Sequence, residues 1–297
     1  MNEKQQIDLS NLINIAALQT IITEAARQTA PKVERISNLI EFEDPKTGAT
    51  TTRPANLKIL RKMAAIYNSS RADLPRNIYL YGGAGTGKST LAADFAAAIK
   101  RPLYALTLGF DTTKSDILGF KTIGGEYMST PIIDAFTGGG VLLLDELDEC
   151  GGQALLYINT ILSTKIGAEI QTPTGPAKRH PEFICIAAGN TIGTGATAKF
   201  CGRSPLDDST RRRFAYIKVD TPREIEESQT SAEFATWLSG VRQRIESASI
   251  EIEINLRDAI AIFDISQKVE GGRREAMEIL YPELSEENLK YICAEQN

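Results

Sequence analysis

The chain has 297 residues, of which 42% are hydrophobic and 24% charged, as is typical of a globular protein with one large domain or two smaller ones. Its formal net charge is -5 and its pI about 5.2, so the overall charge does not favour nucleic-acid binding, although a local basic patch stays open. The polar, charged N-terminus differs from a signal peptide, and no apolar run approaches a membrane span.

The cysteines and the histidine argue against a metal centre built from these residue types. Cys150, Cys185, Cys201 and Cys293 are scattered without Cys-x-x-Cys spacing, and His180 is the only histidine. Cysteines with no disulfide framework predict a reducing compartment and hence a cytoplasmic protein. We expect Cys185, which lies in an apolar run, to be a core residue, and His180 to be part of the polar surface.

Three elements are expected ahead of residue 70. Apolar residues at helical spacing predict a helix from about 8 to 30, which Pro31 ends. The segments 33–43 and 50–53 flank a turn sequence, so we expect a small hairpin there. A second helix is expected over 56–67, because its apolar residues are spaced for one face.

A glycine-rich loop between a strand and a helix dominates the chain. The apolar run 78–81 predicts a buried strand, and 91–99 predicts a helix. Between them lies Gly82-x-x-x-x-Gly87-Lys88-Ser89, the pattern of a P-loop, whose backbone N–H groups and helix N-terminus face phosphates. Lys88 is expected to reach the β- and γ-phosphates, and Ser89 to ligate Mg²⁺. An ordinary glycine-rich turn is the alternative, which the complete pattern and both flanks disfavour. The expected nucleotide-binding residues are Gly82, Gly83, Ala84, Gly85, Thr86, Gly87, Lys88, Ser89 and Thr90.

An acidic pair after a second apolar strand supports this interpretation. The run 141–144 ends in Asp145-Glu146, a Walker B signature, and the carboxyl end of a buried parallel strand is where open α/β sheets bind ligands. We expect Asp145 to hold Mg²⁺ and Glu146 to polarise the attacking water. Asp148 and Glu149, further along, are expected to face solvent or a neighbour.

The remaining elements around this pair are read from the same patterns. We expect a strand over 103–108, short helices over 111–118 and 131–136, a helix over about 152–165, hairpins over 120–128 and 169–180, and strands over 183–188 and 215–219.

Polar residues after the last two strands complete the candidate site. Asn190 follows the strand 183–188 and is expected either to orient the attacking water or to cap its loop. Arg211, Arg212 and Arg213 end a short helix that starts at 204–208. They are expected to complement the helix C-terminus or to form a nucleic-acid patch; in a ring ATPase, they would supply an arginine finger to the next subunit.

From residue 221 onward the pattern is helical throughout. Arg257, at the start of one of these helices, is expected either to reach the γ-phosphate in cis or to be an ordinary exposed arginine. The P-loop and the acidic pair at the end of a buried parallel strand predict an α/β P-loop NTPase fold, an αβα sandwich with a parallel sheet. The expected domains are an N-terminal extension over 1–55, an ATPase core over 56–220 and a helical lid over 221–297.

Taken in order, these motifs resemble an AAA+ ATPase. The residues that carry the resemblance are Gly82–Ser89, Asp145-Glu146, Asn190, Arg211-Arg212-Arg213-Phe214 and Arg257. Within that family, the segments 115–120 and 131–136 resemble the MoxR branch, and 180–183 with 188–193 are similar to its CobS, CbbQ and NorQ group. The Arg-Arg-Arg-Phe end also resembles the McrB restriction motor. The resemblance covers roughly 56 to 291.

The resemblance implies an ATP- and Mg²⁺-dependent homo-oligomer, a hexameric ring with nucleotide at the subunit interfaces. It implies that Arg212 or Arg213 is the arginine finger. It also implies that the hairpins over 120–128 and 169–180 lie near the pore or on one face of the ring. Relatives use ATP turnover to remodel a client protein, often through a von Willebrand A-domain adaptor. A nucleic-acid-linked motor of the McrB type stays open, as does a small-molecule P-loop kinase, which would need no ring. A GTPase is least favoured, because no Asn-Lys-x-Asp guanine motif is present.

Overall fold

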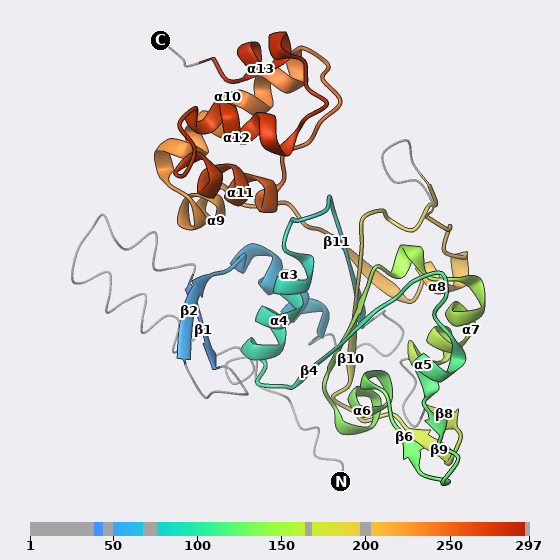
Figure 1. Cartoon of the computed structure of the whole chain (residues 1–297). Helices are drawn as coiled ribbons and strands as arrows, with labels where there is room; N and C mark the ends of the chain where they lie inside the picture. The colour runs from blue at the N-terminus through green and yellow to red at the C-terminus, as the bar shows by residue number, and fades with distance from the viewer. Residues whose placement is uncertain (1–38, 44–49, 68–75, 164–167, 197–202, 295–297) are drawn as a thin grey trace, which may run out of the picture. The chain divides into compact units, whose positions relative to one another are not determined.

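The computed structural model describes residues 39–43, 50–67, 76–163, 168–196 and 203–294 (Figure 1). The helix expected over 8–30 and residues 33–38 of the first hairpin lie outside these ranges. The described residues form two compact units. One holds those up to Gly82 and from Lys88 to Val219, and the other holds Gly83–Gly87 and those from Asp220 onward.

The first unit is organised by a parallel sheet of five strands in the order β11-β3-β10-β7-β4 (Figure 1). The strands are β3 (Asn77–Tyr81), β4 (Leu103–Thr107), β7 (Val141–Asp145), β10 (Ile184–Gly189) and β11 (Phe214–Lys218). The central strands β3, β7 and β10 are almost entirely buried, as continuous apolar runs in a parallel sheet require. The strand order brings the carboxyl ends of β3, β10 and β7 side by side.

Helices cover both faces of this sheet (Figure 1), so the expected α/β P-loop NTPase fold is confirmed. The helices are α3 (Leu57–Tyr67) and α4 (Lys88–Ala98) on one face, and α5 (Lys114–Leu118), α6 (Pro131–Gly138) and α7 (Gly152–Ile161) on the other. Successive strand residues point to opposite faces, so Ile78 and Leu80 join the first apolar core and Tyr79 joins the second. Each fully buried Ile or Leu stabilises the unit by about 1.5–3 kcal/mol.

The caps explain where the short helices begin and end. Thr113 accepts a hydrogen bond from Asp116 N, and the Asp116 side chain accepts one from Thr113 N, a capping box that starts α5 later than expected. Thr130 caps the start of α6, and Gly139 caps its end, where φ is 82° and the left-handed backbone favours glycine. The helix α7 ends at Ile161, short of the expected residue 165.

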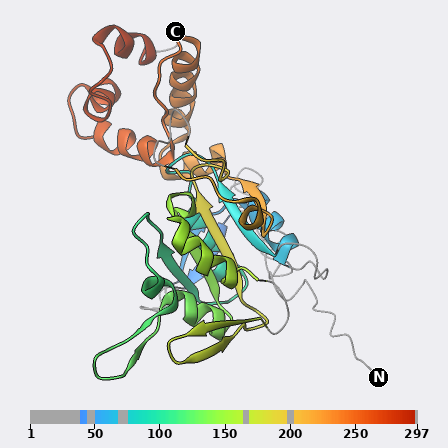
Figure 2. The ribbon, with the colours of Figure 1, turned by 90° about the vertical axis from the view of Figure 1, so that its right-hand side faces the viewer.

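Three antiparallel hairpins accompany the sheet, and all three were expected from turn sequences. Their strands are β1 (Leu39–Glu43) with β2 (Thr50–Pro54), β5 (Phe120–Lys121) with β6 (Tyr127–Met128), and β8 (Glu169–Thr172) with β9 (Gly175–Lys178). The second and third hairpins lie side by side at one end of the first unit (Figure 2). Ile123, in the turn of the second hairpin, is fully exposed.

The second unit is helical, which confirms the expectation for residues beyond 221. Its helices are α9 (Arg223–Gln229), α10 (Ala232–Ser247), α11 (Leu256–Ser266), α12 (Gly272–Leu280) and α13 (Glu286–Ile292). Their apolar faces enclose a separate core around Phe234, whose ring packs edge-on against Phe263. Within the described ranges, no helix has both the length and the apolar character that a membrane crossing requires.

The cysteines and the histidine give a mixed outcome. Cys185 is fully buried in the sheet, as expected, and burial raises the pKa of its thiol. His180 is half-buried rather than part of an open polar surface. Its Nδ1 accepts a hydrogen bond from Glu182 N at 3.1 Å, and its ring lies where a side chain at Gly139 would stand. The small size of Gly139 therefore makes room for the imidazole.

Candidate functional site

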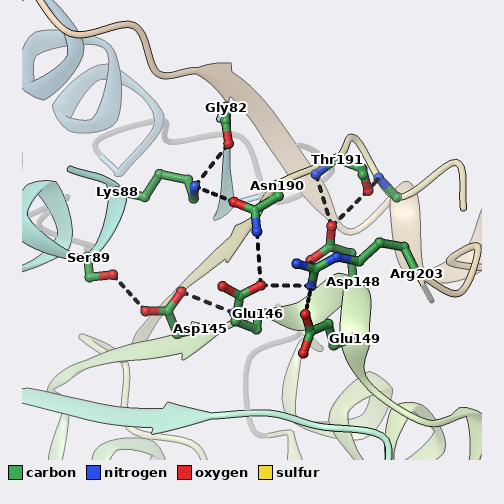
Figure 3. A network of polar contacts seen from close by, with 11 residues as sticks. Gly82, Lys88, Ser89, Asp145, Glu146, Asp148, Glu149, Asn190, Thr191 and Arg203 are labelled. Carbon is green, nitrogen blue, oxygen red and sulfur yellow. Dashed lines mark hydrogen bonds and ion pairs between the residues drawn. The ribbon is translucent and has the colours of Figure 1, made fainter. Parts of the chain in front are cut away.

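The carboxyl ends of β3, β10 and β7 carry one connected set of polar side chains (Figure 3). Lys88 comes from the start of α4, Asp145 and Glu146 from the end of β7, and Asn190 from the loop after β10. Because β10 lies between β3 and β7, its following residue reaches both the lysine and the acidic pair. The structure thus brings together four residues that the sequence analysis took from three separate motifs.

Lys88 is held by two neutral acceptors. Its Nζ donates to Gly82 O and to Asn190 Oδ1, each at 2.9 Å. Burial lowers the pKa of Lys88, and the nearby carboxylates of Glu146 and Asp145 oppose that shift. The ammonium group therefore lies at the edge of the glycine loop in a largely desolvated position, where an anionic ligand would be a stronger acceptor than either amide oxygen.

A hydroxyl–carboxylate pair lies beside the lysine. Ser89 Oγ donates to Asp145 Oδ2 at 2.6 Å, and the other oxygen of Asp145 accepts from Glu146 N at 3.1 Å. Ser89 is exposed while Asp145 is half-buried. Hydroxyl and carboxylate oxygens are the ligands that Mg²⁺ prefers, so the two residues fit the metal role expected of them.

Glu146 has a special backbone conformation. Its φ of 56° and ψ of 39° are left-handed, which is uncommon for a residue other than glycine and costs roughly 1–3 kcal/mol. Its Oε2 accepts from Asn190 Nδ2 at 3.3 Å and from Arg203 Nη1 at 2.8 Å. The surrounding contacts thus hold the carboxylate of Glu146 against the amide of Asn190, with the side chain 33% exposed.

Asp148 faces a neighbouring loop, one of the two directions expected from the sequence. It lies in the 3₁₀ turn η2 (Leu147–Glu149) and is fully buried, so it does not face solvent. Its Oδ2 accepts from both the backbone N and the Oγ1 of Thr191 at 2.9 Å. The short turn directs this side chain inward, toward the loop that carries Asn190. Glu149 is half exposed and forms an ion pair with Arg203.

Arg203 belongs to this site and was missed in the sequence. It pairs with Glu146, Asp148 and Glu149, and only 8% of its side chain is exposed. It lies 57 positions after Glu146, so no local spacing relates the two residues. The one available signal was its place in the segment between Asn190 and the three arginines.

Residues Gly83–Gly87 of the glycine loop belong to the second compact unit. Gly85 and Gly87 have φ values of 70° and 85°, which disfavour any residue with a Cβ atom. A Cβ at Gly85 would lie 2.3 Å from Asn255 Oδ1 and 3.2 Å from Arg257 Cβ, so the start of α11 packs against the loop. Arg257 is therefore next to the loop. The side chain of Thr86 is directed back within the loop, where its Oγ1 donates to Gly83 O at 2.9 Å.

Three more expected nucleotide-binding residues complete the loop region. Ala84 and Thr90 are exposed, and Gly83 packs near Glu253 of the second unit. Their assignment to phosphate binding stays a prediction, as do the roles of the other loop residues.

The three arginines at the end of α8 (Asp208–Arg211) stand apart from this set. Arg212 is 82% exposed and pairs with Asp208 at 3.1 Å. Arg211 and Arg213 are half-buried, and within the described residues the Nε atom of each is buried with no hydrogen-bond partner. The structure places none of them in the Lys88–Glu146 set, so a finger role for Arg212 or Arg213 stays a prediction.

Comparisons with known proteins match the central part of the chain. Residues 77–214 match the family model described as AAA domain (dynein-related subfamily). An uncharacterized protein of Staphylococcus haemolyticus is 29% identical over 168 residues, 52% of this chain and 60% of that protein. One of Staphylococcus saprophyticus is 26% identical over 177 residues, 56% of this chain and 64% of that protein. This chain thus covers less than two thirds of the length of these relatives.

A solved structure of a RuvB mutant of Thermotoga maritima is 14% identical, with a TM-score of 0.45 over 76% of this chain and 70% of that one. The match to the AAA domain includes the glycine loop, the acidic pair and Asn190. The expected similarity to AAA proteins is therefore confirmed for this segment, and the MoxR branch stays a prediction.

Proposed function

Because residues 77–214 match an AAA domain, we propose that this chain binds ATP with Mg²⁺ and hydrolyses it to ADP and phosphate. One observation carries the proposal. The pair Ser89–Asp145 and the chain Lys88–Asn190–Glu146 lie side by side at the end of one sheet (Figure 3). The first supplies oxygen ligands for a cation, and the second supplies an ammonium, an orienting amide and a carboxylate.

We assign Mg²⁺ to Ser89 and Asp145. Their oxygens lie 2.6 Å apart and are hard donors. Within the described residues, no three or more His, Cys, Asp or Glu side chains form a metal cluster, so the remaining ligands would be phosphate and water oxygens. When bound, the cation would neutralise charge on the β- and γ-phosphates.

The protein's own groups then have separate tasks. The ammonium of Lys88 leaves two neutral oxygens for the triphosphate, which binds it more strongly because the bond is charge-assisted. The carboxylate of Glu146 accepts a proton from the attacking water, and Asn190 Nδ2 holds that carboxylate in place. Arg257, beside the glycine loop, is the candidate for a cis contact with the γ-phosphate.

We further propose a homo-oligomeric ring, hexameric as the MoxR resemblance implies. An arginine finger must reach the nucleotide of a neighbouring subunit, and Arg212 is exposed and Arg213 adjoins β11. The ring would remodel a client protein, with a von Willebrand A-domain protein as a candidate adaptor. We place it in the cytoplasm, where Cys150, Cys185 and Cys293 would stay free thiols, as they are in the structure.

The substitution Glu146→Gln tests the proposal, because it keeps the size and hydrogen bonding of the side chain but removes the base. Affinity for ATP with Mg²⁺, measured by calorimetry, should persist while phosphate release falls by roughly 10²-fold or more. The matched control is Glu233→Gln, an exposed glutamate of the helical unit. Near-normal turnover of the Glu146 variant would contradict the assignment, and turnover stimulated by DNA would favour the nucleic-acid motor.

A further inference from the structure

One arginine connects three carboxylates at the candidate site. Arg203 Nη1 lies 2.8 Å from Glu146 Oε2 and 3.3 Å from Asp148 Oδ1, and it also pairs with Glu149 (Figure 3). On the basis of the proposed function, we propose that Arg203 is a positioning residue that fixes the carboxylate of Glu146 for hydrolysis. It acts through Glu146 and touches neither nucleotide nor water in this scheme.

Asp148, the buried partner in this contact, anchors Arg203. Asp148 is fully buried, and its other oxygen accepts two hydrogen bonds from Thr191. The backbone next to Arg203 is also held to the turn η2, because Ser204 N donates a hydrogen bond to Asp148 O at 3.1 Å. Both the main chain beside Arg203 and its guanidinium are therefore fixed to the turn η2. A group held this way can restrain a partner that is itself partly exposed.

Glu146 is the partner that needs restraint. Its backbone is left-handed, and its side chain projects from the junction between β7 and the short turn η2. Its Oε2 accepts from Arg203 on one side and from Asn190 on the other. With one oxygen held by two donors, the carboxylate keeps one orientation, and positioning errors of about 1 Å at such a group can slow a reaction 10²-fold.

A planar guanidinium suits this task better than an ammonium group. Arg203 contacts Glu146 and Asp148 together through one nitrogen, Nη1, at the end of its long planar side chain. A lysine at this position would keep the charge but lose the length and planar geometry that place this nitrogen between the two carboxylates. The expected consequence of Arg203→Lys is a lower kcat with little change in nucleotide affinity, because Lys88 and Ser89 are untouched.

A purely structural role is the competing explanation. Arg203 is the counter-charge of buried Asp148, so its loss would disturb the fold whatever Glu146 does. The two explanations differ in a double-mutant cycle. If Arg203 acts through Glu146, replacing it has no further effect once the carboxylate of Glu146 is gone.

The experiment measures ATP turnover, ATP affinity and melting temperature for wild type, Arg203→Lys, Glu146→Gln and the double variant. We expect Arg203→Lys to lower kcat by about 10-fold to 10²-fold, with affinity within about 3-fold of wild type. In the Glu146→Gln background the same change should alter kcat by less than about 2-fold. The matched control is Arg101→Lys. Its partner Glu182 lies just before the start of β10, whereas the candidate site lies after the end of β10, so this change should leave kcat unchanged.

Each outcome decides between the explanations. If the effects of the two substitutions on kcat multiply in the double variant, the positioning role is wrong, while the proposed ATP hydrolysis still stands. A wild-type protein without ATPase activity, or an active Glu146→Gln variant, would overturn the proposed function and this inference with it. If Arg203→Lys does not fold, Arg203→Gln replaces it in the cycle. Failure of both to fold would make Arg203 a structural residue only and overturn the proposal.

Discussion

Replacing Asp148 should destabilise the first unit far more than replacing an exposed aspartate. In Asp148→Ala, Thr191 loses the acceptor for its backbone N and its Oγ1, both buried and both 2.9 Å from the carboxylate. Arg203, with a nearly buried side chain, loses its one fully buried counter-charge. The variant therefore leaves the two Thr191 donors without their acceptor. It also leaves Arg203 with two partners that are both partly exposed, Glu146 and Glu149.

The size of the effect follows from these losses. Removing one partner of a buried ion pair typically costs about 3–5 kcal/mol, and a buried donor without an acceptor costs about 1–3 kcal/mol. The remaining pairs of Arg203 offset part of this, so we expect Asp148→Ala to lower the free energy of unfolding by about 3–5 kcal/mol. For a unit of this size, that corresponds to a decrease in melting temperature of about 10 °C.

The assay is thermal and urea unfolding followed by circular dichroism, with Asp208→Ala as the matched control. Asp208 also pairs with an arginine, Arg212, but both side chains are mostly exposed. An exposed pair of this kind contributes less than about 1 kcal/mol, so the control should stay within about 3 °C of wild type. Equal stability of the two variants would refute the buried network around Asp148, and with it the anchor proposed for Arg203.

Three further predictions concern binding, assembly and thiol chemistry. Lys88→Ala should weaken ATP affinity by about 10-fold to 10²-fold in calorimetry with Mg²⁺, because it removes a charge-assisted hydrogen bond to the phosphates. Unchanged affinity would contradict the P-loop assignment. Arg213→Ala should lower turnover by about 10³-fold or more, and mixing it with Glu146→Gln protein should restore part of the activity, unless the arginine acts in cis. Burial raises the pKa of the Cys150 thiol to about 12, so iodoacetamide at pH 8 should label Cys150 in the native protein at least about 10³-fold more slowly than a free thiol. Rapid labelling, mapped by mass spectrometry, would contradict its burial.

The sequence by itself determined the elements whose signal is local. The apolar run before Gly82 and the helix after Ser89 are adjacent in the chain, so the strand β3, the loop and α4 follow from periodicity and spacing. The same holds for β7 with Asp145-Glu146, because a buried parallel strand needs a continuous apolar run. Turn sequences likewise placed the hairpins of β5 with β6 and β8 with β9.

Tertiary structure decided which polar side chains meet. Asp148 lies three residues beyond the strand, in a 3₁₀ turn with no strand or helix period, so its inward direction depends on the Thr191 loop that receives it. Arg203 meets Glu146 across 57 positions of sequence, and the hydrogen bond from Ser204 N to Asp148 O holds this part of the chain beside the turn η2. A buried carboxylate and a guanidinium are stable there only as partners, and partnership across 55 residues has no period or spacing from which it can be predicted.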